Sequence, residues 1–193
     1  MDKVDYRVAS LSVLLDEYSA EDVKCLLNSY RAVFDSSTES FLHEKAVDME
    51  KRDLSRTYLA IDGDFDVIGY ITLGIKCISI PDCTGIGSNI LRRMNIDGRS
   101  GIAQSYLLGQ LSRSAKDPKG FGRELMMMAL SELSIAKSKV GCRMLRLDCH
   151  DELVPYYEGL GFKCFCKNEA GTLDQMVTFI RFLTGIQYVP NHR

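Results

Sequence analysis

The chain has 193 residues, of which 46% are hydrophobic and 26% charged, and its formal net charge is −2. This composition is typical of one globular domain, expected here over residues 1–193, and the charge gives no general attraction to nucleic acid or anionic membranes. The sequence contains neither an apolar run of roughly 20 residues nor a secretory signal, so we expect a cytoplasmic protein without a membrane partner.

Seven cysteines are spread along the chain, and no two of them form a Cys-x-x-Cys pair. An odd number without such pairs favours reduced, structural thiols over a disulfide framework. Cys164 and Cys166 would lie on one face of a strand, as two metal ligands can, but no His or Cys partner stands near them in the sequence. We therefore expect no metal.

The first third of the chain predicts one strand followed by two helices. Alternation of apolar and polar residues over Tyr6–Leu15 predicts the strand. Ser19, with Asp22 three residues later, is typical of a helix N-cap, and apolar residues follow at helical spacing. A second helix is expected to begin at Ser36 and to end near Arg52.

A β-hairpin and a long loop come next. Tyr58–Ile61 and Val67–Leu73 predict the two strands, joined through Asp62-Gly63, because this dipeptide suits a turn with positive φ. Gly69 in the second strand indicates a bulge or a close approach of another element, as does Gly74. Residues 81–103 fit no regular element and predict a loop with at most one helical turn, either a wall of a functional site or a surface excursion.

The centre of the chain carries glycines at the mouth of a long helix. A strand over Leu108–Arg113 gives way to the loop Asp117–Gly122, and an apolar, mostly buried helix is expected from Arg123 to about Ser138. The first N–H groups of a helix have no intrahelical partner, and the helix dipole favours negative charge there. These residues predict a binding site for a phosphate or pyrophosphate group. The alternative is a tight turn that binds nothing.

The last third predicts three further strands, a short helix after the first of them, and a tail. The expected elements are a helix stop at Gly141, a strand over Arg143–Cys149, a short helix over Glu152–Leu160, and an antiparallel pair of Lys163–Cys166 with Gln175–Leu183. Residues 168–172 would turn between the paired strands, and residues 184–193 are expected to form a loose tail.

This order of elements resembles the GNAT superfamily of acetyl-CoA-dependent N-acetyltransferases. The family's Arg/Gln-x-x-Gly-x-Gly/Ala loop matches Asp117–Gly122, except that Asp117 replaces the Arg or Gln, and its Tyr-x-x-x-Gly-Phe ending matches Tyr157–Phe162 completely. The resemblance implies an α/β (α+β) fold, with one GNAT-like domain, a mixed and mostly antiparallel sheet flanked by helices, and a V-shaped cofactor cleft near Leu111.

The resemblance also implies a role for each matching residue. The pyrophosphate of acetyl-CoA, the cosubstrate, would be held by Lys119, Gly120, Phe121, Gly122 and Arg123, and its pantetheine arm and thioester by the strand residues Leu111, Ser112 and Arg113, chiefly through backbone groups. Asp117 would weaken this binding or cap the helix. Tyr157 would be the catalytic proton donor to the leaving thiolate, because a phenol with a pKa of about 10 is protonated at neutral pH. Asp148 and His150 are weak candidates for the base.

The expected activity is transfer of an acetyl group from acetyl-CoA to a primary amine of a small molecule or protein, by direct attack in a ternary complex. As an alternative, Phe34-Asp35, Phe41–Ala46 and Leu54–Tyr58 resemble the front half of the GNAT toxins of toxin–antitoxin pairs, which implies aminoacyl-tRNA as acceptor and an antitoxin as partner. The basic residues that would then contact phosphates are Arg92, Arg93, Arg99, Arg113, Lys116 and Lys119. The acidic balance and Asp117 weigh against that alternative. A non-catalytic acyl-CoA-binding or interaction module is the second alternative, and a homodimer is compatible with all three.

Overall fold

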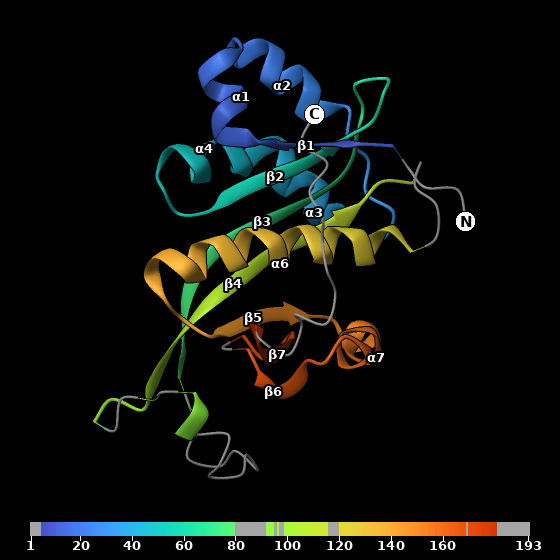
Figure 1. Cartoon of the computed structure of the whole chain (residues 1–193). Coiled ribbons are helices and arrows are strands. Elements are labelled where there is room, and N and C mark those ends of the chain that lie inside the picture. Colours follow the sequence, from blue (N-terminus) through green and yellow to red (C-terminus); the bar gives the residue numbers. More distant parts are fainter. Residues whose placement is uncertain are drawn as a thin grey trace. The chain divides into compact units, whose positions relative to one another are not determined.

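The computed structural model describes residues 5–79, 92–94, 96, 99–115, 120–168 and 170–180 (Figure 1). Its strands are β1 (Arg7–Ser10), β2 (Arg56–Ile61), β3 (Val67–Ser79), β4 (Ile102–Arg113), β5 (Met144–Cys149), β6 (Lys163–Lys167) and β7 (Asp174–Phe179). Within this part of the chain they hydrogen-bond in the order β1-β2-β3-β4-β5-β7-β6. Of the pairings whose register is described, only β4–β5 is parallel, which confirms the expected mixed, mostly antiparallel sheet.

The chain gathers into two compact units. Among the described residues, the first contains the N-terminal part up to Gly74 and the stretch Gly109–Ala129, and the second contains the part of Ile75–Leu108 that is described and residues 130–180. Strands β3 and β4 and helix α6 (Phe121–Val140) therefore each contribute one segment to each unit. The single domain and the V-shaped cleft stay predictions, and the expected tail over residues 184–193 lies outside the described residues.

The opening of the first unit corrects one expectation. Strand β1 ends at Ser10 and is followed directly by helix α1 (Leu11–Glu17), so a strand continuing to Leu15 was wrong. Leu11, Leu14 and Leu15 share one face of a helix, and Leu11 is fully buried in the core against which the other two pack. Burial of this helical face outweighs the short alternation of serine and leucine that had predicted a strand.

The helices that follow begin at side-chain caps. Helix α2 (Ala20–Asn28) begins as predicted, with Ser19 Oγ accepting the Asp22 N–H at 3.1 Å. Helix α3 (Ser36–Ser40), the π-helical segment η1 (Phe41–Lys45) and α4 (Ala46–Lys51) form the second predicted helix. Its cap is Asp35, whose Oδ1 accepts the Ser37 N–H at 2.8 Å. Leu42 and Ala46 from this stretch are buried in the same core as α1 and α2.

Strands β2 and β3 form the predicted antiparallel hairpin, but the conformation of the turn between them differs from the expected one. The positive φ of 62° falls on Phe65, and Gly63 is not left-handed. Instead, Asp62 Oδ1 accepts the backbone N–H groups of Asp64 at 3.0 Å and Asp66 at 2.9 Å. The loop between the strands spans five residues, so the side chain of Asp62 closes the turn that a two-residue Asp-Gly connection would have closed alone.

The second unit has β7 between β5 and β6, which confirms the predicted antiparallel pair and adds β5 to it. Asn168 Oδ1 accepts the N–H groups of Thr172 at 2.9 Å and Leu173 at 3.2 Å, which closes the turn before β7. The short helix η2 (Asp151–Leu153) and α7 (Val154–Gly159) precede β6. The core of this unit contains Ile78, Met94, Ala103, Met144, Phe165 and Val177.

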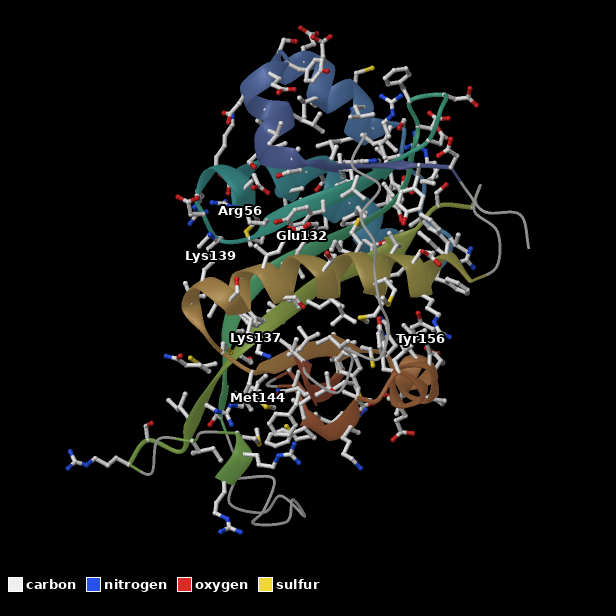
Figure 2. All side chains as sticks on the ribbon, in the orientation of Figure 1. Arg56, Glu132, Lys137, Lys139, Met144 and Tyr156 are labelled. Atoms are coloured by element: carbon white, nitrogen blue, oxygen red, sulfur yellow. The ribbon has the colours of Figure 1, made fainter. Side chains whose placement is uncertain are left out.

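Helix α6 ends where the sequence predicts. Gly141 has a φ of 81°, and its N–H donates to Lys137 O at 3.0 Å. Lys137 and Lys139, labelled in Figure 2, lie in the last turn, where cations interact favourably with the helix dipole. As expected for this helix, all residues from Leu125 to Leu130 are buried. No helix in the described part of the chain is long and apolar enough to cross a membrane.

Most of the long loop predicted between β3 and β4 lies outside the described residues. Arg92 and Arg93 within it are helical, in agreement with the expected single turn, and Met94 is buried. Gly85, Gly87 and Gly98 belong to the undescribed positions.

The first prediction concerns Gly69, which marks a close approach of α6 to β3. A Cβ at Gly69 would lie 3.0 Å from both Leu125 Cδ1 and Phe121 Cε1, and these two side chains are themselves buried. Gly69→Ala should therefore lower the free energy of unfolding by about 1–3 kcal/mol, measured by urea denaturation.

Gly63→Ala is the matched control for Gly69→Ala. It has no heavy atom within 4 Å of its Cβ position, and it should be neutral or stabilising by up to about 1 kcal/mol. Equal unfolding midpoints for the two variants would contradict the close approach.

Candidate functional site

The mouth of α6 is formed by a left-handed glycine. Gly120 has a φ of 108°, a conformation that side chains disfavour, and α6 begins at Phe121, two residues before the expected start. Phe121 and Gly122 thus lie in the first turn of the helix, where backbone N–H groups have no intrahelical acceptor. The N–H of Arg123 donates to Gly120 O at 2.9 Å, and the Arg123 side chain is exposed. Asp117 and Lys119 lie outside the described residues.

The ring of Phe121 fixes where this helix begins. It is 3% exposed and meets the ring of Tyr6 edge-to-face, with centroids 5.2 Å apart and an interplanar angle of 88°. A packed, apolar side chain contributes nothing polar to an anion, so any contact of Phe121 with a phosphate has to come from its backbone.

The end of β4 has one edge that faces away from β3. Ser114 donates its N–H to Ile68 O on β3 at 2.8 Å, whereas Arg113 O accepts the Val33 N–H at 3.3 Å on the opposite side. In an extended strand, the N–H and C=O of one residue point to the same side, and the direction alternates from residue to residue. The N–H and C=O of Leu111 therefore point away from β3, as the carbonyl of Arg113 does. An extended ligand could pair with this edge as an additional strand.

The side chain of Ser112 points into the core of the first unit. Its Oγ lies 2.5 Å from Tyr30 Oη and 2.7 Å from Thr38 Oγ1, and the residue is 9% exposed. Tyr70 Oη donates to Thr38 O at 2.5 Å, and the Tyr30 and Tyr70 rings meet edge-to-face at 5.3 Å. This polar cluster ties β4 to α3 and to the end of α2. The hydroxyl of Ser112 is therefore committed to the core, and by the same alternation its N–H and C=O point to the side of β3.

Tyr157 lies in the second unit, on α7, and is 7% exposed. Its ring contacts Tyr156 at 5.1 Å and Phe162 at 5.7 Å, and its carbonyl accepts the Phe162 N–H at 3.0 Å. The Tyr-x-x-x-Gly-Phe spacing thus has a structural cause, because Gly161, with a φ of 92°, turns the chain so that Phe162 can pack on Tyr157. Burial raises the pKa of Tyr157 above the usual value for a phenol, with smaller contributions from Tyr156 and Cys149.

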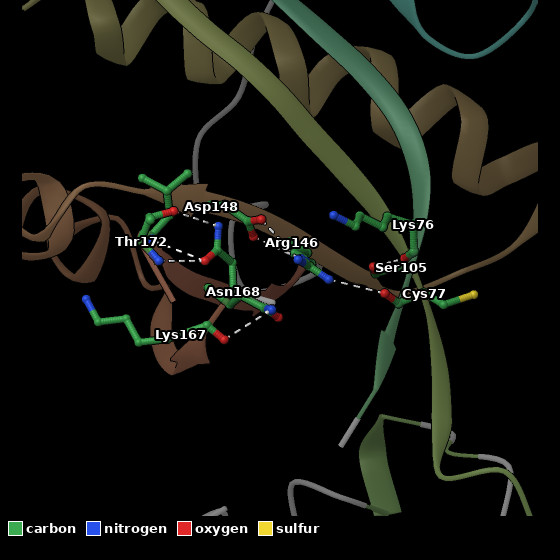
Figure 3. A network of polar contacts seen from close by, with 10 residues as sticks. Lys76, Cys77, Ser105, Arg146, Asp148, Lys167, Asn168 and Thr172 are labelled. Carbon is green, nitrogen blue, oxygen red and sulfur yellow. Dashed lines mark hydrogen bonds and ion pairs between the residues drawn. The ribbon is translucent and has the colours of Figure 1, made fainter. Parts of the chain in front are cut away.

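The two candidate bases have other partners or positions. Asp148 forms a bidentate ion pair with Arg146, with Nε–Oδ1 at 2.9 Å and Nη2–Oδ2 at 3.0 Å (Figure 3). Arg146 is 2% exposed and also donates to Cys77 O at 3.2 Å. The carboxylate of Asp148 is thus already engaged by a buried guanidinium. His150 is exposed, and its carbonyl accepts the Leu153 N–H at 2.9 Å.

Neither a metal nor a cysteine nucleophile fits the described residues. Among them, no group of three or more His, Cys, Asp or Glu side chains is placed to hold a metal ion. Burial raises the pKa of the Cys149 thiol to about 11, so this cysteine is protonated at neutral pH and is a poor nucleophile.

The basic residues proposed for phosphate contacts are only partly described. Arg92 and Arg99 are exposed, and the Arg93 guanidinium carbon lies 4.8 Å from the centroid of the Phe179 ring. That of Arg113 lies 5.4 Å from the centroid of the Phe34 ring. Lys116 and Lys119 lie outside the described residues.

Sequence reasoning missed three parts of this arrangement. It gave no partners to Ser112, because Tyr30 and Thr38 are far away in the chain. It did not single out Arg146, although a charge within the apolar strand Met144–Cys149 indicates a buried ion pair. It noted Phe34 only as part of a motif and gave the side chain no role.

Several solved structures have a fold similar to that of this chain. The chain aligns with a Tyr-to-Phe variant of KacT with a TM-score of 0.71 at 16% identity, covering 93% of this chain and 98% of that one. AtaT complexed with acetyl-methionyl-tRNAfMet aligns with a TM-score of 0.67 at 18% identity, and the alignment covers 88% of this chain and 94% of that one. The third structure is a Tyr-to-Phe variant of the AtaT toxin bound to acetyl-CoA and the C-terminus of the antitoxin AtaR. It aligns with a TM-score of 0.66 at 16% identity, and the alignment covers 93% of this chain and 96% of that one. No family model and no curated protein matches the sequence. These likenesses confirm the predicted GNAT fold and its resemblance to the toxin members.

The second prediction separates a structural role of Ser112 from a cofactor role. Ser112→Ala leaves the hydroxyls of Tyr30 and Thr38 without their shared partner in a buried place, which should cost about 1–3 kcal/mol of unfolding free energy. Affinity for acetyl-CoA, measured by calorimetry at a temperature where both proteins are folded, should change by less than about twofold, a small free-energy difference.

Ser138→Ala serves as the control for Ser112→Ala. Its exposed hydroxyl donates to Ile135 O within α6, and its loss should cost at most about 0.5 kcal/mol. Weaker acetyl-CoA binding without loss of stability in Ser112→Ala would give its side chain a cofactor role instead.

Proposed function

We propose that the protein is an N-acetyltransferase that transfers the acetyl group of acetyl-CoA to the α-amino group of aminoacyl-tRNA. The observation that carries this proposal is the likeness in fold to AtaT complexed with acetyl-methionyl-tRNAfMet. Sequence analysis placed a general primary amine first and charged tRNA second, and the likeness to toxins favours the second. An antitoxin is the corresponding protein partner, as for AtaT with AtaR, and a homodimer stays a prediction.

Two features of the first unit fit the donor. Pyrophosphate binding by the N–H groups of Phe121 and Gly122 is supported by their position in the first turn of α6, next to left-handed Gly120, and the exposed side chain of Arg123 would add a positive charge. The motif adds Lys119. Along β4, the N–H and C=O of Leu111 point away from β3 and offer hydrogen bonds to an amide-containing arm such as pantetheine. Arg113 lies further along the same edge, where its carbonyl already accepts the Val33 N–H, whereas Ser112 directs its backbone groups toward β3.

An α-amino group as acceptor needs no dedicated base, and none has been identified among the described residues. Such an amine has a pKa of roughly 7.7–8.0, so about a tenth or more of it is uncharged at pH 7, whereas a lysine side chain near 10.4 is almost entirely protonated. The uncharged amine attacks the thioester carbonyl, forming the C–N bond as the C–S bond breaks; the nitrogen loses one proton to solvent, and the departing sulfur takes one up. We propose that Tyr157 supplies the proton to sulfur, because it stands at the tyrosine of the Tyr-x-x-x-Gly-Phe ending and a phenol is protonated at neutral pH; solvent returns the proton to the phenol.

The third prediction tests the acceptor. Labelled acetyl-CoA is offered with aminoacylated tRNA and, in parallel, with the same tRNA stripped of its amino acid. Label should enter the charged pool alone, since only that pool carries the α-amino group.

Two outcomes would count against the proposed acceptor. Transfer to protein lysines or small amines without transfer to charged tRNA would return the general acetyltransferase to first place. Binding of acetyl-CoA without transfer to any amine would favour a non-catalytic module.

The fourth prediction concerns Tyr157. Tyr157→Phe removes the proton donor and should lower kcat for charged tRNA by about 100-fold or more, while KM changes little. Tyr156→Phe is the matched control, since Tyr156 is 39% exposed next to Tyr157 on α7, and it should keep kcat within about twofold of wild type.

The pH profile provides a second test of Tyr157. A raised pKa means that the phenol keeps its proton to a higher pH than a free phenol near 10, so its ionisation should not lower the wild-type rate between about pH 6 and pH 9. The rate should rise over this range as the amine loses its proton. A fall in rate above neutral pH, absent in Tyr157→Phe, would show that the tyrosine ionises early and would contradict its assignment.

A further inference from the structure

Phe34 is an exposed aromatic side chain on a fixed backbone. At 84% exposure it is the most exposed large hydrophobic side chain among the described residues. The backbone beside it is held on both sides. Val33 N–H donates to Arg113 O at 3.3 Å, and Asp35 caps α3. Ala32 N–H donates to Glu39 Oε2 at 3.0 Å. An aromatic ring that is left in water on a rigid segment is typical of a binding surface rather than of a frayed loop.

The ring of Phe34 is paired with a positive charge. The guanidinium carbon of Arg113 lies 5.4 Å from the ring centroid, within the range of a cation–π contact. An aromatic face next to an arginine is suited to an unpaired nucleobase and its phosphate, because the base stacks on the ring and the guanidinium contacts the charge.

The position of Arg113 relative to Leu111 on β4 indicates which adenine Phe34 and Arg113 would bind. Arg113 is two residues from Leu111, which corresponds to about 7 Å along a strand. In aminoacyl-tRNA, only an ester and one ribose separate the reacting amine from the terminal adenine. The adenine of coenzyme A lies beyond the pyrophosphate, at the far end of the molecule from the thioester. A base near Leu111 therefore belongs to the acceptor rather than to the donor.

We propose that Phe34 and Arg113 form a stacking platform for the unpaired terminal adenine of aminoacyl-tRNA. This inference rests on the proposed function, since it assumes that the thioester lies at Leu111. It assigns to Phe34 a role in binding the acceptor, and the ring need not touch the reacting atoms.

The test uses direct binding, so that it does not depend on catalysis. A fluorescently labelled single-stranded RNA ending in CCA is titrated with the full-length protein at low salt, and its anisotropy is measured. Phe34→Ala should weaken binding about tenfold or more, Phe34→Trp should retain it, and an RNA that lacks the terminal adenosine should lose the difference between wild type and Phe34→Ala. Phe65→Ala, which removes another aromatic ring that is 76% exposed, should bind like wild type.

Acetyl-CoA titration of the same variants separates the two sources of adenine. Its affinity should be the same within about twofold for wild type and Phe34→Ala, because the platform binds the acceptor. Loss of acetyl-CoA affinity in Phe34→Ala would assign the platform to the coenzyme and overturn the proposal. RNA binding that is absent from the wild type, or equal in Phe34→Ala and Phe65→Ala, would also overturn it.

The outcomes for the platform and for the proposed function are distinct. If the wild type binds the RNA through Phe34 but transfers no acetyl group to charged tRNA, the proposed function fails and the platform stands. If Phe34→Ala acetylates charged tRNA with an unchanged KM, the platform fails and the proposed function stands.

Discussion

The two-residue repeat of β4 is the constraint on which the candidate site depends. Ser112 turns its hydroxyl into the core of the first unit, where Tyr30 and Thr38 hold it at 2.5 and 2.7 Å. Because backbone direction alternates along a strand, the hydrogen bond from Val33 to Arg113 O also defines the side to which Leu111 directs its N–H and C=O. The side chain of Ser112 thus anchors β4 in the core, while the backbone groups of Leu111 on the same strand are available to a ligand. A one-residue shift of register would exchange these roles.

Periodicity predicted most of the elements, and it failed where competing patterns overlapped. The long helix, the hairpin, the closing strands and the stop at Gly141 were expected from spacing and glycine placement. The segment from Leu11 to Leu15 fits both an alternating and a helical pattern, and the exposure of Val13 together with the packing of Leu14 on the core decides for the helix. The turn after β2 could not be predicted from Asp62-Gly63 alone, since the length of the loop determines which residue becomes left-handed.

The candidate site was predictable where it rests on local motifs and unpredictable where it rests on distant contacts. Gly120 and the start of α6 follow from the local sequence, as does the packing of Tyr157 on Phe162. The partners of Ser112 are 82 and 74 positions away along the chain, so no local pattern could identify them. The pairing of Asp148 with Arg146 is local, yet only burial shows that it occupies the carboxylate.

The most direct test of the central claim is the hydrogen-exchange rate of one amide. The N–H of Leu111 can be followed by NMR in the full-length protein, with and without saturating acetyl-CoA. If the arm of the donor pairs with the edge of β4, exchange at Leu111 should slow by an order of magnitude or more when acetyl-CoA binds, because the amide gains a hydrogen-bond acceptor. Unchanged exchange at Leu111 in a protein that binds acetyl-CoA would contradict the account, since the donor would then lie elsewhere.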